Sequence, residues 1–127
     1  MSEAAGRGAP VEEINAVTLA VSDMDRSVAF YLALGFEPVT GGASSGLATF
    51  RAGAGFLNLQ LRAGLEDQGG RWGRVILWVD DVDRMHRRAR DAGMRPATDP
   101  VDAPWGERFF HLRDPDGHEL SFARPIR

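Results

Sequence analysis

The sequence predicts an α+β fold in which two tandem βαβββ modules form a curved mixed sheet around a cleft. Two observations support this prediction. When the chain is shifted by 58 positions, residues 17–38 align with residues 75–96 without a gap, with eight identities in 22 positions. Within each copy, apolar residues first alternate and then recur at helical spacing, which predicts a strand followed by a helix. A repeated unit of this size buries too little surface alone, so the two copies are expected to pack together.

Each copy begins with a strand and a helix. In the first copy Val17, Leu19 and Val21 alternate with small or polar residues, as in a half-buried strand. Asp23 is placed to cap the N-terminus of the following helix, and Gly35 is placed to end it in a left-handed conformation. The second copy has identical residues at the corresponding positions: Val75, Leu77, Val79, Asp81 and Gly93.

Three short strands are predicted after each helix. They cover residues 37–40, 47–51 and 56–61 in the first copy, and 94–96, 108–113 and 118–123 in the second. We therefore expect a flexible N-terminus at 1–10 and one domain over 11–127, with modules at about 13–62 and 74–125 and a linker at 63–73.

The segment Asp114–Gly117 predicts a hairpin turn with a defined register. Pro115 suits the second position of a type I turn, and Gly117 can adopt the left-handed conformation that follows it. A three-residue loop then pairs 113 with 119, 112 with 120, 111 with 121 and 110 with 122. Because cross-strand partners share a face, one face is wholly apolar and should pack on the helices.

The other face of the strands is predicted to line the cleft. Alternation along each strand gives these candidate ligand-binding residues: Thr18, Phe56, Asn58, Gln60, Arg74, Trp78, Phe109, His111 and Ser121, with Trp72 and Trp105 on flanking loops. Aromatic side chains at a concave site suit flat ligands. The register places Glu119 beside Arg113 as its expected partner. Arg74 is then left to bind an anionic or electron-rich oxygen edge of a planar ligand.

Composition excludes several classes of function. The net charge is −3, which gives no electrostatic support for nucleic acid or an anionic membrane as partner. Cysteine is absent, which excludes disulfides and thiolate chemistry, and all basic residues are arginine, which excludes lysine Schiff bases. With no apolar run of transmembrane length and no signal-peptide pattern, we expect a cytoplasmic protein, and the composition suggests a bacterial one.

The two halves carry the motifs Val-Ser-Asp-Met-Asp-Arg-Ser, Phe-Tyr, Leu-Gly-Phe, Val-Asp-Asp-Val-Asp and Asp-Pro-Asp-Gly-His. With the repeat, they resemble the vicinal oxygen chelate superfamily, which includes glyoxalase I, extradiol dioxygenases, fosfomycin-modifying enzymes and bleomycin-resistance binding proteins. The resemblance covers nearly the whole chain after Pro10 and implies the glyoxalase-like fold. It also implies a homodimer.

The resemblance implies four positions for ligands of a divalent metal, and this chain has Ala16, Asn58, Arg74 and Ser121 there. None suits such a metal, so we expect no metal and no cofactor. The interpretation favoured by these residues is a metal-free small-molecule binding protein of the bleomycin-resistance type, sequestering or carrying an aromatic or amphiphilic compound. The alternative is a metal-independent lyase, isomerase or natural-product tailoring enzyme with His111 as base. A regulatory or interaction module without a ligand is a third class.

Two histidines have competing interpretations. His111 and Ser121 are predicted to lie opposite each other, as an acid/base pair, a ligand hydrogen-bonding pair or a structural polar pair. His111 and His118 should point to opposite faces, which argues against a metal pair and favours a role for His118 in the hairpin.

Overall fold

The protein consists of two βαβββ modules with the same order of elements. A computed structural model describes residues 10, 12–64 and 74–126. The predicted N-terminus up to residue 9 and most of the predicted linker, with Trp72, lie outside the described residues. The first module contains β1 (Ala16–Val21), α2 (Met24–Ala33), β2 (Glu37–Gly41), β3 (Leu47–Ala52) and β4 (Gly55–Leu61). The second contains β5 (Arg74–Trp78), α3 (Val82–Asp91), β6 (Val101–Asp102), β7 (Glu107–Arg113) and β8 (Glu119–Pro125).

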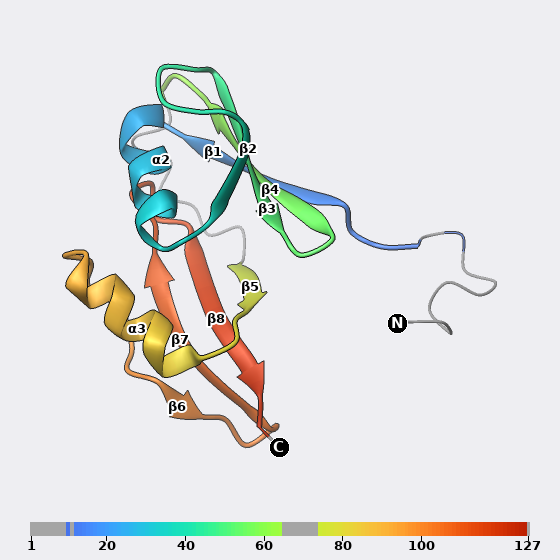
Figure 1. Ribbon diagram of the computed structural model, residues 1–127, viewed down its shortest axis with the longest axis vertical. Coiled ribbons are helices and arrows are strands. Elements are labelled where there is room, and N and C mark those ends of the chain that lie inside the picture. Colours follow the sequence, from blue (N-terminus) through green and yellow to red (C-terminus); the bar gives the residue numbers. More distant parts are fainter. Residues whose placement is uncertain (1–9, 11, 65–73, 127) are drawn as a thin grey trace.

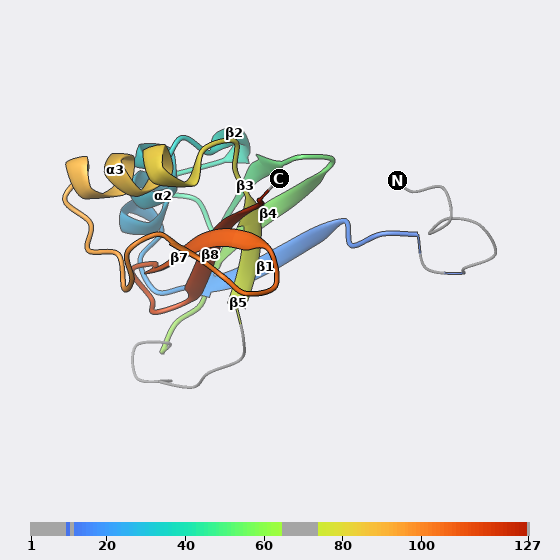
Figure 2. The same cartoon turned by 90° about the horizontal axis from the view of Figure 1, so that it is seen from below.

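Each module has one mixed sheet. The strand orders are β1-β4-β3-β2 and β5-β8-β7-β6, so β1 and β5 lie at corresponding edges of the two sheets. The β1–β4 and β5–β8 pairs are parallel, and the remaining pairs are antiparallel. Both helices lie on the same side of the sheets, as the two views show (Figure 1, Figure 2). The predicted α+β class and tandem modules are confirmed.

The predicted helix ends are also confirmed. The Asp23 side chain accepts a hydrogen bond from the Arg26 amide at 3.1 Å, and Asp81 does the same for Arg84 at 3.0 Å. Gly35 has φ of 96°, a conformation that favours glycine. No helix in the described part of the chain is long and apolar enough to span a membrane.

The predicted strand at 94–96 is wrong. The short strand β6 lies instead at Val101–Asp102 and pairs with β7. Pro96 alone does not explain this difference, because Pro38, at the corresponding position of the first copy, lies within β2 and pairs with Phe50. The chain next to residues 94–96 is still hydrogen-bonded to β7, since the Ala97 amide donates to the His111 carbonyl at 2.8 Å.

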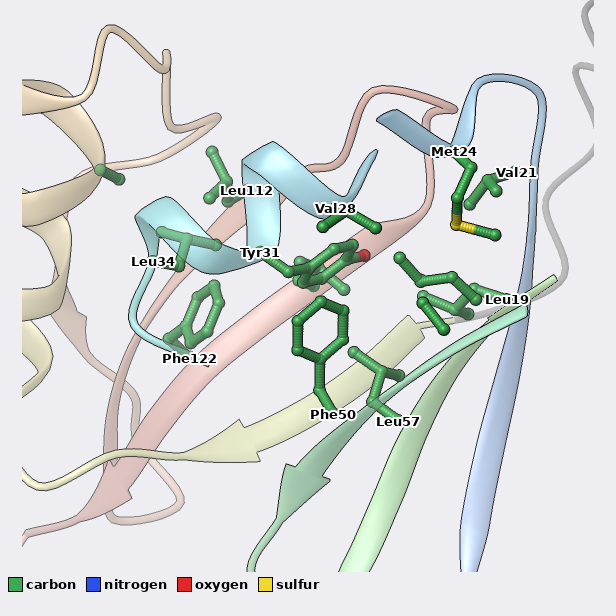
Figure 3. Close-up of a cluster of buried hydrophobic side chains, with 14 of the residues drawn as sticks. Leu19, Val21, Met24, Val28, Tyr31, Leu34, Phe50, Leu57, Leu112 and Phe122 are labelled. Carbon is green, nitrogen blue, oxygen red and sulfur yellow. The ribbon is translucent and has the colours of Figure 1, made fainter. Parts of the chain in front are cut away.

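The core lies between the helices and the inner faces of both sheets. Tyr31, Phe50, Phe110 and Phe122 are almost fully buried and belong to one apolar cluster that includes residues of both modules (Figure 3). The β7–β8 hairpin has the predicted register, with His111 opposite Ser121. These pairings place the predicted apolar face of the hairpin in the core.

The hairpin turn 114–118 joins the two modules and is called the inter-module turn below. The Tyr31 hydroxyl donates to Asp114 Oδ2 at 2.7 Å, and the Ser22 hydroxyl donates to Asp116 Oδ1 at 2.6 Å. His118 Nε2 lies 2.7 Å from the Ala20 carbonyl oxygen. The role expected for His118 within its own hairpin is therefore incomplete, because the ring also contacts the first module.

Candidate functional site

A pocket of about 810 Å³ opens between the two modules. Its walls are β5 on one side and, on the other, the start of β1, the β3–β4 hairpin and the C-terminal end of α2. Leu34, Leu57 and Phe122, which are buried in the core, form part of its lining. Small-molecule sites are typically about 300–1,000 Å³ and mostly apolar, so this pocket has a suitable size and lining.

The internal repeat explains where the pocket forms. Ala16 corresponds to Arg74, and their partners across the sheets are Phe56 and Glu119, so the β3–β4 hairpin corresponds to the β7–β8 hairpin. In this alignment Ala52 and Gly55 take the places of Asp114 and His118, the side chains that join the modules elsewhere. The first module thus has small residues at the two positions where the second module has side chains that contact the other module. Both Ala52 and Gly55 line the pocket.

One rung of paired residues in the first sheet forms part of the pocket wall. It runs across β2, β3, β4 and β1 through Glu37, Arg51, Phe56 and Ala16, and all four line the pocket. The Arg51 guanidinium lies 5.5 Å from the centre of the Phe56 ring, a cation–π distance. Arg51 Nε lies 3.7 Å from Glu37 Oε1.

The opposite wall is β5, whose side chains alternate between the core and the outer face. Arg74, Ile76 and Trp78 are the outer ones, and the last two are 58% and 65% exposed. Glu119 lies opposite Arg113 as the register predicted, but its charge partner differs. Arg74 Nη2 lies 3.8 Å from Glu119 Oε2, whereas Arg113 donates to the Gly117 carbonyl. Glu119 lies between the two arginines in the sheet, so register alone could not select its partner.

His111 anchors a polar cluster on the outer face of the second sheet. Its Nδ1 lies 2.8 Å from the Ser121 hydroxyl and 3.7 Å from Glu119 Oε2. Burial lowers the pKa of His111; Glu119 opposes this shift and Arg74 adds to it. The imidazole is therefore neutral at neutral pH and can accept a proton or a hydrogen bond. The ring of Phe109 lies 5.0 Å from that of His111, and Trp105 stacks on Phe109.

A second polar cluster lies on the outer face of the first sheet. Asn58 Nδ2 donates to the Thr18 hydroxyl at 3.2 Å, and the Thr49 hydroxyl donates to Asn58 Oδ1 at 2.7 Å. Gln60 is exposed further along the same face. The side chains of Thr18 and Asn58 thus already have partners within the sheet.

The structure brings together some of the predicted ligand-binding residues. Phe56, Arg74 and Trp78 line the pocket. The other described members of the predicted set lie on the flanking outer faces: Thr18, Asn58, Gln60, Trp105, Phe109, His111 and Ser121. Arg51 was not predicted, although it alternates with the buried Phe50 in β3 and so belongs to the outer face.

The residues at the four expected metal positions do not fit a divalent cation. Ala16 offers a methyl group, and Asn58 offers an amide whose oxygen already accepts from Thr49. Ser121 is hydrogen-bonded to His111, and Arg74 places a permanent positive charge beside Glu119. Within residues 10, 12–64 and 74–126, no three His, Asp or Glu side chains are grouped so as to hold a metal ion.

A model of the glyoxalase/bleomycin resistance protein/dioxygenase superfamily matches residues 13–122. Mb0911c of Mycobacterium bovis is 39% identical over 59 residues, which cover 46% of this chain and 39% of that protein. Rv0887c of Mycobacterium tuberculosis matches with the same identity over 35% of its length. The matched region is therefore well under half of each curated relative.

Solved structures share the fold over most of the chain. A glyoxalase/bleomycin resistance protein/dioxygenase from Nocardioides superimposes with a TM-score of 0.75 at 22% identity, over 95% of this chain and 88% of that one. The bleomycin resistance determinant encoded on transposon Tn5 has a TM-score of 0.74 at 26% identity, over 89% and 98%. A bleomycin-binding protein in complex with bleomycin has a TM-score of 0.70 at 26% identity, over 90% and 98%.

Proposed function

Because the chain belongs to the glyoxalase/bleomycin resistance protein/dioxygenase superfamily, we propose that it is a metal-free small-molecule binding protein that sequesters or carries an aromatic or amphiphilic compound. The observation that carries this proposal is the pocket between the modules. Its lining combines the rings of Phe56 and Trp78 with the apolar core side chains Leu57 and Phe122, and it includes Arg74. Such a lining suits a compound with an apolar body and few polar groups.

The comparison with bleomycin-binding proteins supports a binding role without naming the ligand. One similar structure contains bleomycin, at 26% identity to this chain. A titration that follows tryptophan fluorescence tests the proposal, with bleomycin and a panel of anionic, neutral and cationic aromatic compounds as probes. Saturable quenching by at least one compound, lost in a Trp78→Ala variant, is expected. Quenching that is unchanged in that variant contradicts binding in this pocket.

The purified protein is expected to carry no stoichiometric divalent metal. Ala16, Asn58, Arg74 and Ser121 supply no carboxylate or imidazole at the four relevant positions. Elemental analysis after dialysis against a metal-free buffer measures the content directly. About one metal ion per chain, lost on substitution of Asn58 or Ser121, contradicts the proposal.

A metal-independent enzyme is the second candidate, and His111 favours it. A neutral imidazole in contact with the Ser121 hydroxyl can act as a general base. Arg74, on the other side of Glu119, could stabilise negative charge that develops on a substrate. Multiple turnover that is abolished by His111→Gln favours the enzyme, whereas retention of an unchanged compound favours the binding protein.

We also propose a homodimer. The outer face of the second sheet exposes large apolar side chains, with Ile76 58%, Trp78 65% and Trp105 70% exposed. Ile76 and Trp78 lie on the edge strand β5, and Trp105 lies in the turn between β6 and β7. Exposed apolar side chains beside open sheet edges favour contact with a second copy. Sedimentation at several concentrations is expected to give twice the chain mass, and a monomer mass at every concentration contradicts the proposal.

A further inference from the structure

Arg51 of the first module and Arg74 of the second both line the pocket. We propose that these two arginines form a clamp that holds a carboxylate of the ligand, so that the pocket selects amphiphilic acids over neutral or cationic compounds. The clamp rests on the proposed function of the pocket and specifies which compounds it accepts.

The charge of the pocket lining supports this selectivity. Of the lining residues that the structure describes, Arg51 and Arg74 are positive and Glu37 is the one acid. The rest of the lining is apolar or uncharged, including Leu57 and Phe122 from the core. Two guanidinium groups beside apolar walls attract an anion more strongly than the same groups on an open surface, because water screens them less.

Both arginines have capacity for another acceptor. Arg51 lies 3.7 Å from Glu37 and Arg74 lies 3.8 Å from Glu119, distances too long for hydrogen bonds. The two arginine side chains are 47% and 48% exposed, and exposed ion pairs of this kind contribute little. A ligand carboxylate could therefore replace Glu37 and Glu119 as the partner of these guanidinium groups with little loss of stability.

Arg108 differs from these two arginines because its guanidinium is hydrogen-bonded to carboxylates of the protein. Its guanidinium donates two hydrogen bonds to Asp83, at 2.9 and 3.0 Å, and one to Asp102 at 2.9 Å. These carboxylates accept hydrogen bonds from Nε and from both terminal nitrogens of the Arg108 guanidinium. Neither Arg51 nor Arg74 has such an arrangement among the described residues.

Arg51 is also held in position. In the sheet, Arg51 lies opposite Glu37 of β2 on one side and opposite Phe56 of β4 on the other. Its guanidinium lies over the Phe56 ring. A charged group that is already ordered loses less conformational freedom when a ligand binds. Its counterpart in the repeat is Arg113, which donates to the Gly117 carbonyl and does not line the pocket. Arg113 is therefore a matched control.

The test compares 2-naphthoate with 2-naphthamide, which share a ring system and differ in charge. Calorimetric titration of the full chain is expected to show tighter binding of the carboxylate. Arg51→Gln and Arg74→Gln should each lower this preference by about tenfold, the effect of losing one charge-assisted hydrogen bond. Arg113→Gln should leave it unchanged. Binding of 2-naphthamide to every variant verifies that the pocket remains folded.

Each alternative result has a distinct meaning. Equal binding of the two compounds to the unsubstituted protein overturns the clamp while the proposed function stands. A preference that depends on Arg74 and not on Arg51, or equally on Arg113, also overturns the clamp. Failure of both compounds to bind overturns the clamp, and it counts against the proposed function only if the wider aromatic panel fails as well.

Discussion

Replacement of Trp78 by alanine is expected to weaken the binding of aromatic ligands by about 2 kcal/mol, the cost of truncating a central aromatic contact. The Trp78 ring belongs to the pocket wall, and its high exposure leaves it available to a ligand. The loss should not vary with pH, because an indole does not titrate. Calorimetric titration of the tightest aromatic ligand at pH 6 and pH 8 measures both effects.

Trp105 provides the control for this experiment. It is 70% exposed, close to the 65% of Trp78, but it lies outside the pocket lining. Its ring stacks on Phe109, and its indole N–H donates to Glu107 at 3.1 Å. Trp105→Ala is expected to change ligand affinity by less than about 0.5 kcal/mol, the usual range for surface substitutions. A larger effect at Trp105 than at Trp78 would place the ligand beside Trp105 and Phe109, outside the pocket.

The second large effect is expected at the contact between the modules. Tyr31→Phe should lower the free energy of unfolding at pH 7 by about 1–3 kcal/mol, because it leaves the buried Asp114 carboxylate without its hydroxyl donor. Urea unfolding followed by fluorescence gives this value. Thr49→Val is the matched control, since it removes a hydroxyl that donates to the neutral Asn58.

The effect of Tyr31→Phe should depend on pH in a defined direction. Burial raises the pKa of Asp114, and the hydrogen bond from Tyr31 opposes that rise. With a raised folded-state pKa, the contribution of Asp114 to stability is greatest below its unfolded pKa and is lost as pH rises through the folded pKa. Removal of the hydroxyl raises the pKa of Asp114 further, so the destabilisation should be larger at pH 7 than at pH 4. An equal loss at both pH values contradicts this account.

Local patterns in the sequence were sufficient to predict the two modules and the register of the β7–β8 hairpin. The Asp-Pro-Asp-Gly turn and the apolar residues at alternate positions fixed the pairing of His111 with Ser121, because another register would mix apolar and polar side chains. The helix caps at Asp23 and Asp81 followed from the same kind of short-range rule. The copies diverge after the second helix: Pro38 lies within β2, whereas the corresponding Pro96 precedes the edge strand of the second module, which begins only at Val101.

Contacts between distant residues could not be predicted in this way. Asp114 and Asp116 have the residue types that turns prefer, and nothing local indicates that they also bind Tyr31 and Ser22, more than 80 positions away. The same limit applies to the pocket. Alternation assigns Arg51, Arg74 and Trp78 to the outer faces of their strands, but only the packing of one module on the other brings these side chains to the same pocket.

Identification of a small molecule that the protein retains distinguishes a binding protein from an enzyme. The immobilised protein is incubated with a cell extract and washed, and the compounds released on denaturation are measured by mass spectrometry, alongside a Trp78→Ala control. We expect one compound, retained chemically unchanged in stoichiometric amount by the unsubstituted protein and not by the variant. Conversion of the captured compound over many turnovers, or equal retention by the Trp78→Ala variant, would contradict a binding protein that uses this pocket.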